Sequence, residues 1–185
     1  MAGLWRRIGL GAALVPHWVH TAWLGLLRAH VGKPVEIVQG AVLREGEVLL
    51  TLRRDLRGWE LPGGNLLPGE VPEAAARREV FEETGVDVEV LALSGTYHRT
   101  GFLPHRARVY RCRPIGGAPT PSDETPRVAW WPVEALPEAV LPWCRAPLAD
   151  ALAGGATPVE RHERQGLREI VESARIDLRA RWRGE

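Results

Sequence analysis

Cysteine is scarce in this chain, which excludes a fold held together by disulfides. Only Cys112 and Cys144 occur among 185 residues, and their spacing is not that of a metal site. We interpret both as ordinary thiols of a protein in a reducing, cytoplasmic compartment. A strong excess of one charge is also missing, because 24 Lys and Arg oppose 23 Asp and Glu, giving a formal net charge of +1. No nucleic-acid partner bound mainly by charge is therefore expected.

Long uncharged runs are rare, and the one that stands out is Ile8–Leu27, which contains no Asp, Glu, Lys or Arg. Its length could cross a bilayer as a helix, but Pro16, His17 and His20 dilute its hydrophobicity. No small-residue cleavage site supports a secretory signal. We expect residues 1–33 to form a helical extension packed on the domain or on a second subunit of a homodimer. A weak peripheral membrane contact and a true membrane span are the alternatives.

The rest of the chain mixes short β-rich and helical segments. Alternating or β-branched residues predict strands at Val35–Leu43, Val48–Arg53, Val86–Leu93, Ala107–Arg113 and Val128–Trp131. Helical patterns predict a turn at Val133–Leu136, a helix at Arg145–Leu152 and an amphipathic helix over Pro158–Trp182. The last helix is expected to pack on the domain surface, with a partner helix as the alternative. Together these segments indicate an α/β fold.

Three carboxylates crowd the segment Arg78-Glu79-Val80-Phe81-Glu82-Glu83-Thr84-Gly85. In a helix Glu79 shares a face with Glu82 and Glu83, and Gly85 is suited to end that helix. Glu82 and Glu83 then lie in the last turn, where the helix dipole disfavours anions by about 0.3–1 kcal/mol each. A segment that opposes local preferences in this way is typical of a functional site. Clustered oxygen ligands suit Mg²⁺ or Mn²⁺, whereas the alternative is a solvated helix face supported by Arg78.

Two glycine turns precede the acidic segment. Trp59-Glu60-Leu61-Pro62-Gly63-Gly64 predicts a strand end and a tight turn, Pro68-Gly69-Glu70 predicts a second turn, and Pro72 suits the first position of a helix. The expected order is strand, glycine loop, acidic helix and glycine stop. This order places carboxylates beside a backbone that can approach phosphates closely.

The segment from Gly64 to Val86 resembles the signature box of the Nudix hydrolases. Every conserved position of that pattern is filled, by Gly64, Glu70, Arg78, Glu79, Val80, Glu82, Glu83, Gly85 and Val86. The resemblance implies the family's α/β/α sandwich with a mixed sheet at residues 34–154, between the extensions 1–33 and 155–185. It also implies a Mg²⁺- or Mn²⁺-dependent hydrolase that cleaves the diphosphate of a nucleoside diphosphate linked to another group.

The resemblance also implies roles for individual residues. Glu82 and Glu83 are expected to be the principal metal ligands, Glu79 a ligand or proton acceptor, and the Gly63 carbonyl a backbone ligand. Arg78 would orient Glu79 by a charge-assisted hydrogen bond. Two further acids have less specific positions: Glu70 would tie the loop to the helix or bind another ion, and Glu124 would be a distal base or ligand.

The substrate is expected to be a small nucleotide, and the sequence leaves its identity open. The Trp59–Gly64 segment resembles mutator-type hydrolases of oxidised nucleoside triphosphates, and is also compatible with enzymes of ADP-ribose or other nucleotide sugars. Candidate substrate contacts are Arg53 for phosphates, Gly64 for close backbone approach and Trp59 for stacking on a base. A core position is the alternative for Trp59. A nucleotide-sensing module without catalysis is the alternative function.

Overall fold

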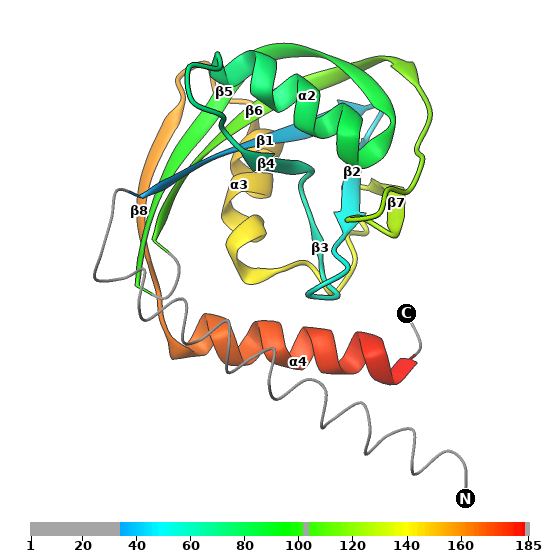
Figure 1. The fold of residues 1–185 in the computed structure, drawn as a ribbon, viewed down its shortest axis with the longest axis vertical. Helices are drawn as coiled ribbons and strands as arrows, with labels where there is room; N and C mark the ends of the chain where they lie inside the picture. The colour runs from blue at the N-terminus through cyan, green and yellow to red at the C-terminus, as the bar shows by residue number, and fades with distance from the viewer. Residues whose placement is uncertain (1–33, 102–103, 184–185) are drawn as a thin grey trace, which may run out of the picture.

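A mixed eight-stranded β-sheet forms the centre of the computed structural model, which describes residues 34–101 and 104–183 (Figure 1). The strand order is β3-β2-β1-β6-β5-β8, with β4 paired to β1 and β7 to β2. The strands are β1 (Val35–Arg44), β2 (Glu47–Leu52), β3 (Trp59–Glu60), β4 (Gly63–Asn65), β5 (Val86–Gly101), β6 (His105–Gly117), β7 (Arg127–Pro132) and β8 (Val159–Gln165). The β1–β6 and β5–β8 pairs are parallel, and the remaining pairs are antiparallel.

Helices cover both faces of this sheet because successive strand residues point to opposite sides. On one face, α2 (Pro72–Thr84) packs its buried side chains, such as Val80, against Val38 and Tyr110 of the sheet. On the other face, α3 (Pro142–Ala153) packs Leu148 against the neighbouring strand residues, such as Val109. Two apolar cores result, and they confirm the predicted α/β/α sandwich (Figure 1).

The predicted strands are all present, and two of them are longer than their apolar patterns indicated. β5 continues to Gly101 and β6 to Gly117, because the two strands pair along most of their length. The predicted hairpin joins β1 to β2, where Arg44 pairs with Glu47. Glu45 and Gly46 form its turn at positive φ values of 37° and 80°, and glycine at the second position adopts such a value without strain.

The ends of α2 follow from its sequence. Pro72 occupies the first turn, where the missing N–H leaves no hydrogen bond unmade. Gly85 ends the helix in the left-handed conformation at φ 69°, and its N–H donates to the carbonyl of Phe81 at 2.8 Å. Glu82 and Glu83 therefore lie in the last helical turn, as predicted.

The expected helix over Pro158–Trp182 is wrong in its first part, where β8 takes its place. β8 pairs in parallel with β5, from Gly95 opposite Val159 to Gly101 opposite Gln165. The charged side chains of β8 find partners on neighbouring elements, such as Arg161 with Asp150 of α3. Strand pairing with a distant segment thus overrides the local helical pattern.

The helix α4 (Leu167–Arg183) follows β8 and packs on its own domain, as expected. Its buried Asp177 accepts hydrogen bonds at Oδ1 from the backbone N–H of Arg57, at 3.0 Å, and from Arg181, at 2.8 Å. Arg181 also donates to the carbonyl of Asp55 at 3.1 Å. These bonds fasten α4 to the loop between β2 and β3.

The hypotheses for the N-terminal extension concern residues 1–33, which lie outside the described residues. Within the described ranges, no helix combines the length and the apolar character needed to span a membrane. Cys112 and Cys144 are both buried free thiols, and burial raises the pKa of each to about 12. Both are therefore unreactive, in agreement with the interpretation as ordinary thiols.

Candidate active site

A cavity of about 840 Å³ opens between the sheet, the β2–β3 loop, the loop before β7 and α4. Its volume lies in the range of small-molecule sites. Acidic, basic and apolar side chains share its wall. Among them are Ile37, Gln39, Arg53, Arg54, Glu60, Gly63, Gly64, Glu83, Arg99, Asp123, Glu124, Trp143 and Ile170.

Glu83 presents the most strongly perturbed carboxylate of this wall. Its pKa is raised to about 8, mainly by burial and in addition by the negative charges of Glu60 and Glu79, while the Gly63 hydrogen bond and the charge of Arg53 oppose the rise. The backbone N–H of Gly63 donates to its Oε2 at 3.0 Å. Thr125 also donates to the backbone carbonyl of Glu83 at 2.6 Å, which joins the end of α2 to the loop before β7.

Arg78 is the centre of a network that collects the other box carboxylates. Its guanidinium holds both oxygens of Glu70, at 2.9 and 3.0 Å, in a bidentate pair. It also donates to Glu79 at 2.8 Å and to Glu82 at 3.0 Å. The hydrogen bond from Arg78 lowers the pKa of Glu70, whereas burial raises that of Glu79. The predicted contact between Arg78 and Glu79 is thus present, and Arg78 also supports Glu82 one helical turn later.

Glu70 and Glu82 differ in how free their oxygens are. Both oxygens of Glu70 are engaged by Arg78, and Oε2 also accepts from the backbone N–H of Leu67 at 3.2 Å. This geometry fits the tie between loop and helix better than a second ion. The side chain of Glu82 is 57% exposed and can turn toward a ligand.

The double glycine lies directly against the acidic helix. A Cβ on Gly64 would overlap the carboxylate of Glu79, and a Cβ on Gly63 would overlap the backbone of β1 at Val38 and Gln39. Only glycine lets β4 approach both α2 and β1 this closely. Gly64 thus lines the cavity and contacts Glu79 at the same time.

We expect Gly64→Ala to reduce turnover by about tenfold to a hundredfold while the fold persists, because only the end of the Glu79 side chain must move. Steady-state kinetics together with thermal unfolding measure the two effects. Gly63→Ala is the contrasting variant, since its Cβ meets backbone atoms and should lower stability as well. Unchanged turnover in Gly64→Ala would show that the position of Glu79 does not matter.

Arg53 reaches the cavity in a held orientation. Asp55 accepts two hydrogen bonds from it, at 2.7 and 2.6 Å, and Glu60 accepts a third at 3.1 Å. The charge of Glu60 is the main cause that raises the pKa of Arg53. The second oxygen of Glu60 accepts from the indole N–H of Trp143 at 3.0 Å. One buried carboxylate therefore orients both a cation and an aromatic ring at the cavity wall.

Trp59 does not reach the cavity, and the predicted stacking on a base is incorrect. Its side chain is 5% exposed and packs edge-on against Trp131, with ring centroids 5.3 Å apart. The alternative core position is therefore the observed one. Trp143, absent from the sequence-based candidates, lines the cavity instead. Nothing in its sequence context separates it from the other tryptophans.

Arg99 is a second cavity residue that is absent from the sequence-based candidates. It is buried, donates to Glu163 of β8 at 3.1 Å, and contacts His105 at 3.0 Å and the carbonyl of Trp143. Gln39 is a third. Its Oε1 is buried with no hydrogen-bond partner among the described residues.

The structure thus brings Arg53, Gly63, Gly64, Glu83 and Glu124 to one cavity. Glu124 is exposed there, and its backbone carbonyl accepts from the N–H of Arg54 at 3.1 Å. The Arg78 network is not part of the lining. It adjoins the cavity through the contact between Gly64 and Glu79.

Comparison with known proteins agrees with this geometry. A NUDIX domain model matches residues 35–152. The MutT-like protein of Streptomyces ambofaciens is 41% identical over 133 residues, covering 70% of this chain and 84% of that protein. A NUDIX hydrolase structure from Nitrosomonas europaea superposes with a TM-score of 0.66 at 21% identity, covering 74% and 82% of the two chains. An ADP-ribose pyrophosphatase structure from Streptococcus suis superposes with a TM-score of 0.60 at 23% identity, covering 71% of this chain and 100% of that chain.

Fold, acidic helix and family match together define a hydrolase of diphosphate linkages in small nucleotide substrates. The chain belongs to the NUDIX family.

Proposed function

We propose that this pyrophosphohydrolase works with Mg²⁺ or Mn²⁺ held by Glu79, Glu82, Glu83 and the carbonyl of Gly63. The observation that carries the proposal is the state of Glu83. Its carboxylate lies at the cavity wall, and burial together with neighbouring carboxylates raises its pKa to about 8. A buried carboxylate among other carboxylates is stabilised by a bound cation.

The neighbouring arginines do not form an ion pair with Glu83, because their guanidinium groups are engaged by other carboxylates. Arg78 is engaged by Glu70, Glu79 and Glu82, and Arg53 is engaged by Asp55 and Glu60. Glu83 receives a backbone N–H from Gly63. The donor set consists of hard oxygens, which fits Mg²⁺ or Mn²⁺ rather than a softer metal.

When bound, the cation would neutralise the charge of the substrate diphosphate and orient its oxygens. Arg78 orients Glu79 and Glu82 by the hydrogen bonds described above. Glu79 then serves as a further ligand or accepts the proton of the attacking water. Glu124, at the cavity wall, is the second candidate for the proton acceptor.

Substrate binding is proposed to divide between the basic and the apolar parts of the wall. Arg53 and Arg54 would face phosphate oxygens, and Trp143 with Ile37 would contact a nucleobase. We propose a nucleoside triphosphate or its oxidised form as substrate, supported by similarity to a MutT-like protein. The cavity volume of about 840 Å³ also suits a nucleotide sugar such as ADP-ribose, the alternative substrate.

A phosphate-release screen tests the substrate and the metal together. It should cover canonical and oxidised nucleoside triphosphates, ADP-ribose, other nucleotide sugars and dinucleoside polyphosphates, each with Mg²⁺ and with Mn²⁺. We expect activity that chelation by EDTA abolishes and added Mg²⁺ restores. Full activity in EDTA would exclude the metal proposal. Tight nucleotide binding without turnover across the panel would favour a sensing module.

We expect Glu82→Gln to lower turnover by on the order of 10²-fold or more while the fold persists, because a neutral amide is a weaker ligand for a hard cation. Kinetics at several Mg²⁺ concentrations and circular dichroism measure the two effects. Glu134→Gln is the matched control, an exposed carboxylate in the turn after β7. Wild-type rates for Glu82→Gln would reject its assignment as a ligand.

We further propose that residues 34–154 form the hydrolase domain and that the protein acts in the cytoplasm, where its nucleotide substrates occur. The segment 1–33 is proposed to supply a homodimer contact or a weak membrane contact. Sedimentation with and without anionic vesicles, together with the molar mass in solution, distinguishes the two contacts.

A further inference from the structure

Two histidines and a glutamate form a cluster on adjacent strands, outside the nucleotide cavity. His98 on β5 lies directly opposite His162 on β8 in the parallel pairing. Glu160 lies two residues before His162, so both side chains point to the same face of the sheet. Strand pairing therefore places the three side chains together.

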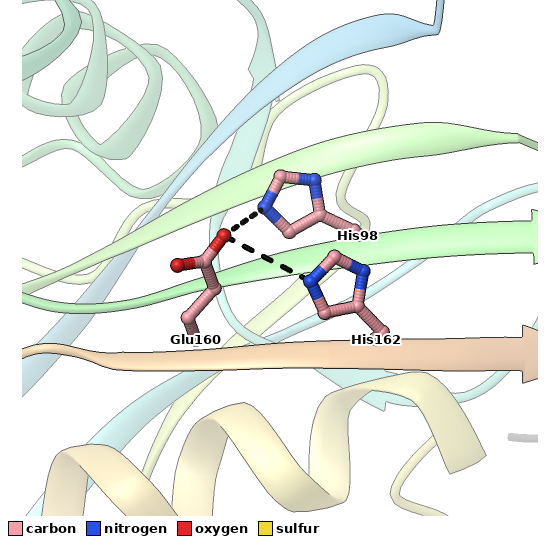
Figure 2. A group of neighbouring side chains, drawn as sticks. All are labelled: His98, Glu160 and His162. Carbon is pink, nitrogen blue, oxygen red and sulfur yellow. Dashed lines mark ion pairs between the residues drawn. The ribbon is translucent and has the colours of Figure 1, made fainter.

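The side chains of the cluster converge on one point, as Figure 2 shows. The two imidazole rings stack with centroids 4.6 Å apart and an interplanar angle of 8°. The Nε2 of His98 lies 3.0 Å from Oε1 of Glu160, and the Nε2 of His162 lies 3.9 Å from the same oxygen. One potential metal-ligand atom from each residue lies within 4.8 Å of the other two. Small side-chain adjustments would place all three ligand atoms roughly 2.0–2.2 Å from one ion, the distance typical of zinc ligands.

We propose that His98, Glu160 and His162 bind a divalent transition metal of borderline softness, such as Zn²⁺. Two imidazole nitrogens and one carboxylate oxygen are a ligand set that such metals prefer and Mg²⁺ does not. Three protein ligands leave a coordination position for water or another group. The side chains of Glu160 and His162 are 67% and 75% exposed, so an ion can enter from solvent without movement of the backbone.

This site is separate from the proposed Mg²⁺ site because none of its three residues belongs to α2 or lines the cavity. Side chains alternate along both strands. The neighbours of His98 and His162 in sequence include Arg99, which lines the cavity, and Arg161, which pairs with Asp150 of α3. The cluster faces away from both.

A metal here would join two parts of the chain. β8 is an edge strand beyond the family match at 35–152, and it leads directly into α4. α4 contributes Glu169, Ile170 and Ser173 to the cavity wall. An ion shared by β5 and β8 would therefore hold the C-terminal extension, and with it this wall, against the hydrolase domain. Its effect would be increased stability of the extension.

The test is metal titration of the tag-free full chain, with excess Mg²⁺ present to occupy the box carboxylates. We expect one Zn²⁺ per chain by calorimetry, and visible d–d absorption when Co²⁺ replaces it. His98→Gln and His162→Gln should each weaken Zn²⁺ binding by at least about tenfold and remove the Co²⁺ spectrum. In wild type, Zn²⁺ should also raise the melting temperature, and it should not do so in the variants.

Two controls make the outcome specific. Glu89→Gln removes an exposed carboxylate elsewhere on β5, where it pairs with Arg113, and should bind Zn²⁺ as wild type does. The double variant His98→Gln/His162→Gln keeps His17, His20 and His30, and therefore shows whether these histidines bind Zn²⁺ instead. Zn²⁺ binding that persists in the double variant, or that is absent from wild type, would overturn the proposal and leave Glu160 as an ion-pair partner of the histidines. Both results can be read whether or not the chain hydrolyses a nucleotide.

Discussion

Glu83→Gln is expected to stabilise the metal-free protein at pH 8 and to reduce Mg²⁺-dependent turnover by on the order of 10²-fold or more. The two effects share a cause, because the buried carboxylate is unfavourable without a cation and needed with one. Its pKa is about 8 in the folded protein, above the ordinary value of 4.5. Such a group contributes stability below pH 4.5 that is lost as the pH rises through about 8. The amide removes this loss while it still accepts the hydrogen bond from Gly63.

Thermal unfolding from pH 4.5 to pH 9 in EDTA measures the first effect. We expect a gain on the order of 2 kcal/mol, or about 4–8 °C, at the upper end of that range and little at the lower end. Mg²⁺ should raise the melting temperature of wild type at pH 8 and change that of Glu83→Gln much less. Glu134→Gln should resemble wild type throughout. Equal melting temperatures of Glu83→Gln and wild type at all pH values would contradict the explanation.

Arg78→Gln is expected to reduce kcat by about a hundredfold, with a smaller change in KM, because one guanidinium orients three carboxylates. Without it, Glu70, Glu79 and Glu82 lose their shared partner, and the position of Glu79 against Gly64 is no longer determined. Arg78→Lys should recover little, since a point charge cannot replace the bidentate pair with Glu70.

Arg77→Gln is the matched control for this experiment. Arg77 is the adjacent residue of α2, is exposed, and pairs with Asp87 outside the cavity. Its replacement should leave kcat within about twofold of wild type, as for most exposed ion pairs. If Arg77→Gln and Arg78→Gln behave alike, the network does not position the site.

The acidic helix and its boundaries were predictable because their determinants are local. Pro72 and Gly85 mark the two ends of α2 through backbone conformation alone. The spacing of Glu79, Glu82 and Glu83 then places them in its last two turns. The hairpin of β1 and β2 was predictable for the same reason, since Glu45 and Gly46 form a two-residue turn.

Local sequence patterns did not predict which tryptophan lines the cavity. Trp59 adjoins the glycine turn in sequence, yet its ring packs on Trp131 in the core. Trp143 is far away in sequence, yet a hydrogen bond to Glu60 holds its ring at the cavity wall. Neither outcome follows from neighbouring residues, because each depends on a contact with a residue distant in the chain.

The C-terminal region shows the same limit for secondary structure. The charged residues of β8 have no strand pattern of their own, and the strand exists because β5 offers a free edge to pair with. That pairing also brings Glu163 to Arg99 and His162 to His98.

The sequence by itself determined the acidic helix, because turns, caps and spacing within one short segment specify it, and the resemblance of that segment to the Nudix box implied the family and its α/β/α fold. The tertiary structure alone decided the cavity wall, the burial of Glu83, the ring at position 143 and the histidine cluster on β5 and β8. These features arise from contacts between residues distant in the chain, whose partners a local pattern does not specify.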